Sequence, residues 1–464
     1  MHRTAIHDER PALGRLAAQV AEQAIAAGAD AAEVVVQSGA ELSVKVRRSE
    51  TELIREAGSR GLGLRVFRDH RAAVTYTSDF TPEGLAAFVA DSVALSRLAE
   101  PDELNELPER EWLLKGAAPD LDLWDDDALT VTTEDALTRA RTAEAAALGY
   151  SPKVTNTDGA SYSRVVGAGA LALADRSGVV FSGQSRGTYQ SLVVEPICDD
   201  ADGKKRNGHY WTADRFLSRL ESPEAVGREA ARRTIAKLDP EKLATQELPV
   251  VFDPDAARAL VRLVFSVVSG GAIYRKASYL CGREGTEVAS KLVTISDEPH
   301  IVRGPGSRGY DGEGLPTRRN VIVEAGALKT YLCDCYSARK LGRLPNGVAG
   351  RGVGGSPHVS TSNLMLAPGE IQERRDLWKD LKRGLYVTDM MGFGFNAVTG
   401  DFSRGAAGFL IEDGKLTRPV GEITISRNLD ELLQGIDAIA SDLELRSSIA
   451  APSFRVDRMT VSGR

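Results

Sequence analysis

Two carboxylates are the first candidates for chemistry, because Asp311 and Glu313 are separated by a single glycine within residues 310–314. In an extended segment, side chains at positions i and i+2 share a face, so the two groups could work as an acid–base pair. The same glycine-rich run also fits a turn whose carboxylates pair with Arg318 or Arg319. We favour the turn, and the sequence leaves both interpretations open.

Other patterns match active-site motifs in residue type, but not in the secondary structure that those motifs require. Residues 297–300 (DEPH) offer several metal-ligand side chains, but neighbours on a strand point to opposite faces, so we expect a solvated turn before Pro299. Residues 183–187 (GQSRG) fit G-x-S-x-G. A nucleophile elbow needs a strand-to-helix turn, whereas this run lies between strand-like segments, so we expect a hairpin turn. Two G-x-G-x-x-G runs, at residues 304–309 and 350–355, open no helix and predict no phosphate site.

Metal sites are equally hard to build from this sequence. None of the six histidines is followed by glutamate, which excludes a His-Glu-x-x-His helix. Cys333 and Cys335 would share one face of a strand, and their spacing is neither C-x-x-C nor a zinc-ribbon knuckle. We interpret both as small buried residues. Four cysteines in 464 residues form no disulfide framework, so we expect a reducing cytoplasm.

Composition limits the partners. The chain is 42% hydrophobic and 27% charged, which is typical of a globular protein. Its net charge is −7 with no basic block, so neither nucleic acid nor an anionic membrane is an expected partner. No apolar run approaches the ~20 residues that span a bilayer.

The periodicity predicts an α+β protein with three parts. Residues 1–105 carry helices near 11–27 and 82–93 and alternating strands between them, which predicts a small α+β layer. After an acidic linker (101–127) that Trp112 and Trp124 should pin, residues 106–240 carry a helix ending at Gly149, two long strand-rich runs and a helix over 214–237. Residues 245–464 predict a domain dominated by antiparallel β-sheet.

The C-terminal part is predicted to open on an apolar strand over residues 248–252. A helix should follow, with Asp253 as its N-cap and proline at the first helical position. Farther on, Asp413-Gly414 between apolar runs predicts a type I′ hairpin. Residues 322–329 match residues 410–417 nearly position for position. An internal duplication, with two equivalent hairpins in one sheet system, and simple convergence on hairpin chemistry both explain this, and we favour convergence. Asp401, at a Thr-Gly-Asp-Phe corner, is expected to be structural, its carboxylate capping free backbone N–H groups.

These C-terminal motifs resemble the TldD/PmbA family, once called modulators of DNA gyrase. The likeness covers most of residues 245–445, and its most specific runs are 293–299 (VTISDEP), 310–314 (YDGEG), 321–332 (VIVEAGALKTYL) and 399–403 (TGDFS). The family's TldD-like branch carries a His-Glu-x-x-x-His run on the helix after the first strand of this domain, plus a later cysteine, which together hold zinc. Here that helix has no His, Glu, Asp or Cys over residues 260–272, and no cysteine follows Cys335.

The resemblance therefore implies the PmbA branch, also called TldE, which is the metal-free subunit of a heterodimeric cytoplasmic zinc metallopeptidase. It implies no catalytic residue and no metal in this chain, zinc in a TldD-like partner, and small unfolded peptides as substrates. For the chain in isolation, the resemblance leaves a homodimer open. On this interpretation Tyr310, Asp311, Glu313 and Arg351 line a partner-facing peptide groove.

Two alternatives of other classes remain. One is a stand-alone peptide-binding scaffold without a peptidase partner. The other is an independent hydrolase that uses Asp311 and Glu313, either on a metal or as an acid–base pair. A DNA-binding role, which the old family name suggests, fits the charge least.

Overall fold

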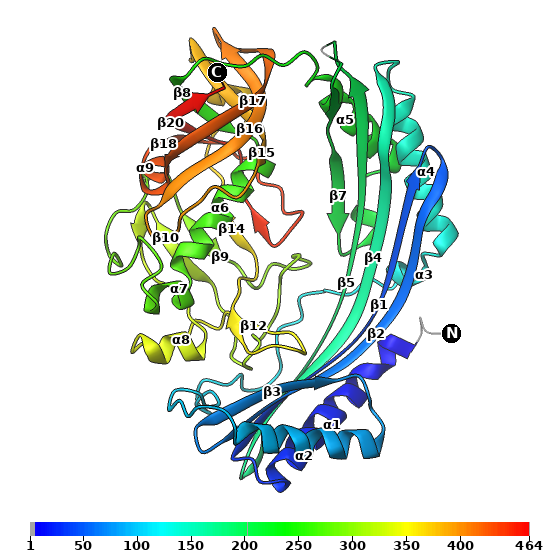
Figure 1. Ribbon diagram of the computed structural model, residues 1–464, viewed down its shortest axis with the longest axis vertical. Coiled ribbons are helices and arrows are strands. Elements are labelled where there is room, and N and C mark those ends of the chain that lie inside the picture. The colour runs from blue at the N-terminus through cyan, green and yellow to red at the C-terminus, as the bar shows by residue number, and fades with distance from the viewer. Residues whose placement is uncertain (1–4, 202, 464) are drawn as a thin grey trace.

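The computed structural model describes residues 5–201 and 203–463, with side chains from residue 9 onward. One long twisted sheet forms a wall with helices on one face, and a C-terminal unit lies against the other face (Figure 1). The sheet and helices of the first half and the strand-rich second half confirm the predicted α+β class. No described helix is long and apolar enough to cross a bilayer.

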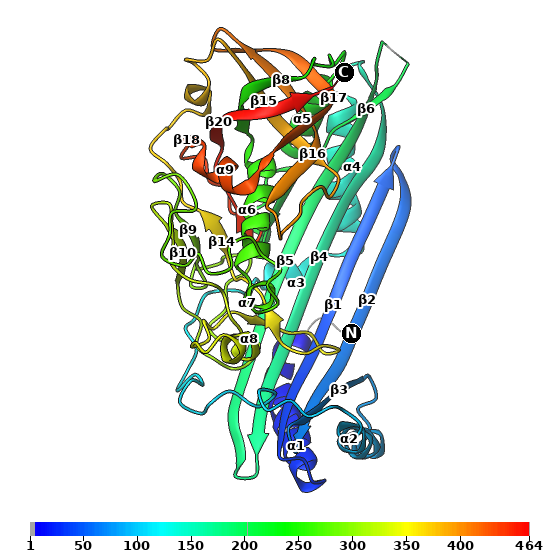
Figure 2. The same ribbon diagram turned by 60° about the vertical axis from the view of Figure 1, so that its left-hand side comes forward.

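The wall is an antiparallel sheet with the strand order β3-β2-β1-β4-β5-β6, and β7 also pairs with β5. Its strands are β1 (Ala31–Arg47), β2 (Glu50–Arg68), β3 (Arg71–Thr77), β4 (Val154–Asp175), β5 (Gly178–Asp199), β6 (Lys205–Asn207) and β7 (Tyr210–Asp214). β4 and β5 have 22 residues each, so each is roughly 70 Å long. Figure 2 shows these strands running along most of the molecule. Because β1 pairs with β4, strands from the predicted 1–105 and 106–240 parts share one sheet; the domain boundaries themselves stay predictions.

The two faces of this sheet are distinguished by simple alternation. Even-numbered residues of β1, such as Val34 and Val44, pack under helices, whereas Val35 points to the C-terminal unit together with Leu171 and Leu173 of β4. The helices on the first face are α1 (Ala5–Ala26), α2 (Pro82–Ser96), α4 (Thr133–Leu148) and α5 (Pro223–Ile235), and a short α3 (Asp127–Thr130) precedes α4. The linker tryptophans pack into these cores as expected, Trp124 under the helices and Trp112 on the other face.

The predicted helix over 214–237 is wrong in its first part. β7 and a 3₁₀ turn, Leu217–Arg219, come first, and α5 begins only at Pro223. The physical reason is a cap: the Ser222 hydroxyl accepts the N–H of Ala225, and proline occupies the first helical position.

The C-terminal unit contains a sheet that closes on itself. Its order is β17-β16-β15-β8-β20-β18, and β17 also pairs with β20. These strands are β8 (Gln246–Phe252), β15 (Arg383–Met391), β16 (Asp401–Glu412), β17 (Lys415–Asn428), β18 (Ile436–Ile439) and β20 (Phe454–Ser462). β8 and β15 are parallel, so the predicted antiparallel character has an exception here. α6 (Pro254–Val268) follows β8 with Asp253 as its N-cap, as predicted.

α6 contributes to the core that the closed sheet shares with a second sheet, ordered β11-β10-β9-β14-β19. This second sheet contains β9 (Ile295–Asp297), β10 (Asn320–Glu324), β11 (Ala327–Leu328), β14 (Leu364–Leu366) and β19 (Ile449–Ala450). The remaining elements are short: α7 (Gly270–Tyr274), α8 (Cys335–Lys340), α9 (Leu429–Gln434), the 3₁₀ turn Arg374–Leu377 and the β12–β13 pair (Ala349–Gly350 and His358–Val359).

Both predicted hairpins are present, with the backbone geometry that a type I′ turn requires. Asp413 and Gly414 have φ of 47° and 73°, and Ala325 and Gly326 have φ of 46° and 84°. The first joins β16 to β17 in the closed sheet, and the second joins β10 to β11 in the other sheet. Their places in different sheets contradict equivalent hairpins in one sheet system and agree with convergence.

The backbones of the wall and the C-terminal unit approach each other closely at Gly63 of β2. A methyl group on Gly63 would lie 1.9 Å from the carbonyl oxygen of Val353, whereas one on Gly58, in the same strand, would have its nearest neighbour at 3.9 Å. Only a hydrogen atom therefore fits between these two backbones at Gly63.

We expect Gly63→Ala to lower stability by about 1–3 kcal/mol, because the added methyl group overpacks this contact. Gly58→Ala is the matched control in the same strand and should melt close to the native chain. Thermal unfolding of the three proteins checks this, and equal melting of both variants would contradict the contact.

Candidate functional site

A cavity of about 650 Å³ lies between the wall and the C-terminal unit. The face of β1, β4 and β5 that is turned away from the helices, the linker around residues 118–124 and the loop 307–312 enclose it. The linker is held there by a backbone bond from the Leu114 N–H to the Gly314 carbonyl, 2.9 Å long. Three of the four predicted groove residues line this cavity, namely Tyr310, Asp311 and Arg351.

Asp311 shapes the loop that enters the cavity. Its carboxylate accepts backbone N–H groups from Glu313, Leu315 and Ala349 at 2.9–3.0 Å. These bonds fold the run into a tight turn, in which Gly314 has a φ of 82°. Asp311 and Glu313 therefore do not share the face of an extended strand.

The favoured interpretation, a turn whose carboxylates pair with Arg318 or Arg319, is right about the turn and wrong about the arginines. Arg318 donates to the Pro345 carbonyl and Arg319 to Glu298, so neither arginine meets Asp311 or Glu313. Backbone N–H groups bind the Asp311 carboxylate instead. The sequence does not predict such donors, because almost every residue type carries a backbone N–H.

Glu313 points away from the main cavity and lines a neighbouring one of about 390 Å³. It is buried and accepts the Cys335 N–H at 2.8 Å. Burial, followed by the nearby Asp311 and Asp334 carboxylates, raises the pKa of Glu313 to about 8. Burial also raises the pKa of Asp311, although its three N–H bonds oppose this. At neutral pH the Glu313 carboxyl group therefore holds a proton.

Arg351 is fixed by a residue that sequence reasoning missed. Its guanidinium lies 2.5 Å from Glu33 of β1, and Arg65 of β2 lies 3.3 Å from the same carboxylate oxygen. Burial would raise the pKa of Glu33, but the two arginines hold it below its usual value. A glutamate inside the apolar run 31–36 was the available signal.

Tyr310 meets β5 at the segment that was expected to be a hairpin turn. Residues 183–187 lie inside β5 instead, so that expectation is wrong, although Ser185 is indeed no nucleophile elbow. Burial raises the pKa of Tyr310 to about 12, and its hydroxyl bonds to Ser185. A Cβ on Gly183 would lie 2.7 Å from the Tyr310 ring, so this glycine permits a close approach.

The cavity wall is rich in arginine. Arg308 donates to the carbonyls of Ala349 and Ser360, and Arg215 donates to those of Gly304 and Pro305. Burial lowers the pKa of both guanidinium groups. This surface offers positive charge and backbone groups, which suit an extended peptide better than they suit acid–base chemistry.

The other candidate residues line neither of these two cavities. Asp297 is 1% exposed in β9, with its pKa raised by burial to about 6, so the solvated turn is wrong. Asp401 is exposed and accepts the Thr399 hydroxyl at 2.6 Å and the Asn428 amide at 3.2 Å, rather than backbone N–H groups. Cys333 and Cys335 are buried as predicted, but they lie in a loop and at the start of α8 instead of on a strand.

The raised pKa of Glu313 predicts a defined pH dependence. A carboxyl group whose folded pKa is about 8 stabilises the fold most below its ordinary value of 4.5, and this stabilisation is lost as the pH rises to 8. The Glu313→Gln side chain stays neutral at every pH. We therefore expect the free energy of unfolding of this variant, relative to that of the native chain, to rise by more than about 1 kcal/mol between pH 5 and 8.5. Urea unfolding at both pH values measures this, with the exposed Glu370→Gln as control. A constant difference between the Glu313 variant and the native chain would contradict the burial of a protonated carboxyl group.

The chain is 33% identical to Metalloprotease PmbA of Escherichia coli O157:H7, over 94% of this chain and 93% of that protein. It is 34% identical to the PmbA homolog of Haemophilus influenzae, over 95% and 94% of the two chains. The TldD homolog of H. influenzae is 28% identical, over 59% of this chain and 61% of its own.

Solved structures share the whole fold. A Bacteroides thetaiotaomicron protein described as a modulator of DNA gyrase superposes with a TM-score of 0.88 at 28% identity, over 97% of this chain and 98% of its own. TldE of Thermococcus kodakarensis superposes with a TM-score of 0.83 at 20% identity, over 96% and 99%, which is a likeness of fold alone.

Family profiles cover most of the chain. Those of PmbA/TldA metallopeptidase domain 1, central domain and C-terminal domain match residues 32–96, 126–238 and 245–463. Together with the PmbA relatives, these matches show that the chain belongs to the PmbA/TldD metallopeptidase family.

Proposed function

We propose that this chain is the metal-free subunit of a heterodimeric cytoplasmic peptidase, and that a TldD-like partner holds the zinc. The substrates we propose are small unfolded peptides, which the pair degrades or trims. The observation that carries the proposal is the composition of α6, the helix on which the resemblance places the zinc ligands of the TldD-like branch.

Zinc needs three or four N, S or O ligands held at fixed positions. The residues of α6 that face the core are apolar, and its outward positions after the first turn include Arg262 and Ser266. Elsewhere in the described ranges, 5–201 and 203–463, no three His, Cys, Asp or Glu side chains gather as a metal site. The residues of this chain therefore do not fit zinc, and we assign it no catalytic step.

The proposed role is to form a wall of the substrate chamber. Tyr310, Asp311 and Arg351 line the 650 Å³ cavity, and we retain them as groove residues. Glu313 lies behind them and supports the loop through the Cys335 N–H. Because three backbone N–H groups already bind the Asp311 carboxylate and Glu313 faces another cavity, we do not favour the alternative of an independent hydrolase that uses this pair.

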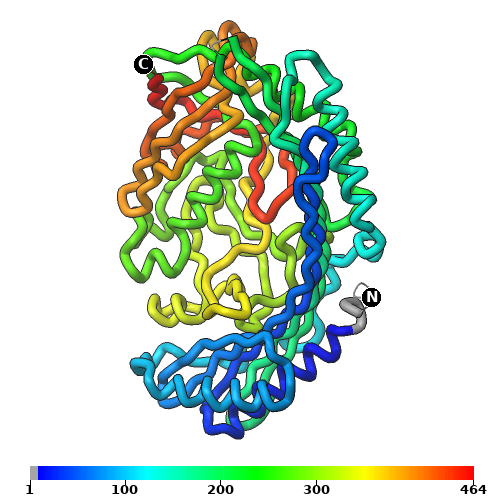
Figure 3. Tube along the Cα trace, turned by 45° about the vertical axis from the view of Figure 1, so that its right-hand side comes forward, coloured from blue at the N-terminus to red at the C-terminus, as the bar shows by residue number. Residues whose placement is uncertain are grey.

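A second feature supports a partner. β3 pairs with β2 only from Leu62 to Arg68, so within the described chain the outer edge of residues 50–61 has no neighbouring strand. Figure 3 shows the β1–β2 hairpin, in blue, along the side facing the viewer. An open edge of this length is a template for strand addition by another chain or by an extended peptide.

The test is reconstitution. The purified chain, incubated with zinc and then gel-filtered, should retain no stoichiometric metal and cleave no unfolded peptide, because it lacks a ligand set. Mixed with a TldD-like protein from the same organism, it should form a stable complex and raise peptide hydrolysis at least about tenfold over the partner alone. Metal emission spectroscopy and a fluorogenic peptide assay measure both.

The control is the same mixture with the partner's zinc removed by a chelator, which should be inactive. Chelator-sensitive cleavage by this chain alone would overturn the proposal. A partner that is fully active without this chain would reject its role as an obligatory subunit.

A further inference from the structure

A second cavity, of about 560 Å³, lies between α5 and the closed sheet of the C-terminal unit. Its volume is within the range of roughly 300–1,000 Å³ that is usual for ligand sites. None of the predicted groove residues lines it. Its buried end is formed by Trp378 and Tyr386, and its mouth by the exposed Leu416 and Thr417.

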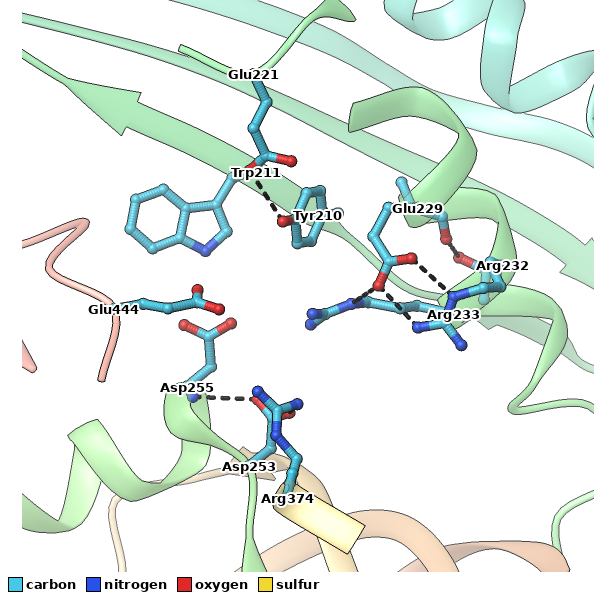
Figure 4. Close-up of polar contacts among 12 residues, drawn as sticks. Tyr210, Trp211, Glu221, Glu229, Arg232, Arg233, Asp253, Asp255, Arg374 and Glu444 are labelled. Carbon is cyan, nitrogen blue, oxygen red and sulfur yellow. Dashed lines mark hydrogen bonds and ion pairs between the residues drawn. The ribbon is translucent and has the colours of Figure 1, made fainter. Parts of the chain in front are cut away.

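One wall carries two guanidinium groups on a single carboxylate. Arg232 bonds Glu229 through two nitrogens at 2.7 and 2.8 Å, and Arg233 bonds it through Nε at 2.8 Å (Figure 4). Although burial would raise it, these bonds lower the pKa of Glu229 to about 2, so the carboxylate is ionised at any physiological pH. One positive charge on this wall is therefore left over.

Arg233 is oriented for a ligand. Its Nε is bound to Glu229, and its guanidinium carbon lies 4.7 Å from the centre of the Tyr210 ring. Its two terminal nitrogens have no hydrogen-bond acceptor among the residues that the structure describes. In Figure 4 that end of the side chain points into the open space. A fixed guanidinium fork with free donors matches a carboxylate, which it can bind through two parallel bonds.

The facing wall has the opposite sign. Asp255, in the first turn of α6, lines the same cavity and pairs with Arg258 at 3.2 Å. Its carboxylate faces that of Glu444, so two acidic groups lie together here (Figure 4). Asp253 is satisfied by Tyr386 and Arg374, and Lys237 closes one side through a 2.8 Å bond to Asp389. The two halves of the molecule are thus bridged at Lys237, whereas Arg233 and Asp255 remain apart across the cavity.

An apolar surface lies beside these charges. The rings of Trp378 and Tyr386 pack at a tilt of 45° with their centroids 5.0 Å apart, and Phe409 belongs to the same cluster. Such a surface favours an aliphatic or aromatic side chain over a bare ion.

We propose that this cavity binds a short peptide with free ends. Its C-terminal carboxylate lies on Arg233, its ammonium group faces Asp255, and an apolar side chain packs on Trp378. The ligand class deepens the proposed function and rests on it, because hydrolysis of peptides yields fragments with new carboxylates. The site then holds product or trimmed peptide on the metal-free subunit.

Calorimetric titration of the full chain, without partner, tests the site. The probe is the tripeptide Ala-Ala-Phe as free acid, compared with its C-terminal amide, its N-acetyl form and inorganic phosphate. We expect the acid to bind at least about tenfold more tightly than the amide, because a charged hydrogen-bond pair is lost in the amide. The N-acetyl form should bind more weakly than the tripeptide with a free N-terminus. Inorganic phosphate should not displace that tripeptide.

Two variants localise the binding. Arg233→Met should weaken binding of the acid at least about tenfold and leave binding of the amide unchanged. Arg233→Lys should bind the acid almost as weakly as Arg233→Met, because an ammonium group lacks the planar fork of donors. Arg228→Met, exposed on the same helix, is the matched control and should bind like the native chain. Glu229 keeps Arg232 in the Arg233 variants, so their melting should be near native.

Equal binding of acid and amide by the native chain would overturn the proposal, whatever the variants do. Native-like affinity of Arg233→Met would overturn it as well, and displacement by phosphate would reveal a general anion site instead. These titrations use the chain alone, so an inactive complex with a TldD-like partner would reject the proposed function without altering their outcome.

Discussion

The buried carboxylate of Glu33 is the interaction on which the relation between the two halves depends. It is fully buried on β1 and lies between Arg65 of the same sheet and Arg351, which is 318 residues away in the chain. Removing one partner of such a buried group typically costs about 3–5 kcal/mol, because a charge is left without compensation. The loop that carries Arg351 therefore has one position against the wall, and the main cavity takes its shape from that position.

Beside the apolar cluster around Val35, the boundary between the halves has further polar contacts, and these explain why cavities persist there. Arg215 donates to the Gly304 carbonyl, Arg339 to that of Leu104 and Arg446 to that of Trp211. Long arginine side chains that end on carbonyl oxygens hold the surfaces together at isolated points, whereas apolar side chains would fill the space between them. Both large cavities lie along this boundary.

Local chemistry was predictable from the sequence, and contacts to distant backbone were not. The Asp253 cap, the Asp413-Gly414 turn and the α+β class follow from signals within a few residues. The Asp311 turn depends partly on the Ala349 N–H, and backbone donors carry no residue type to recognise. The sequence predicts a turn at residues 183–187 because they lie between strand-like runs, but they belong to β5, where Gly183 makes room for Tyr310. Glu33 is a different case. A charged residue within an apolar strand predicts a buried ion pair, but the sequence does not show which residue is its partner.

The open edge of β2 also bears on solubility. A bare strand edge invites unspecific stacking of sheets, and proteins discourage it with charges along the strand. Residues 50–61 carry three glutamates and two arginines, together with two glycines that weaken the strand. Both signs are present, so a second identical edge meets like charges in some alignments and opposite charges in others. Whether a second strand pairs favourably with this edge thus depends on its register along β2. A shift of one residue would move every side chain of the added strand to the opposite face of the sheet.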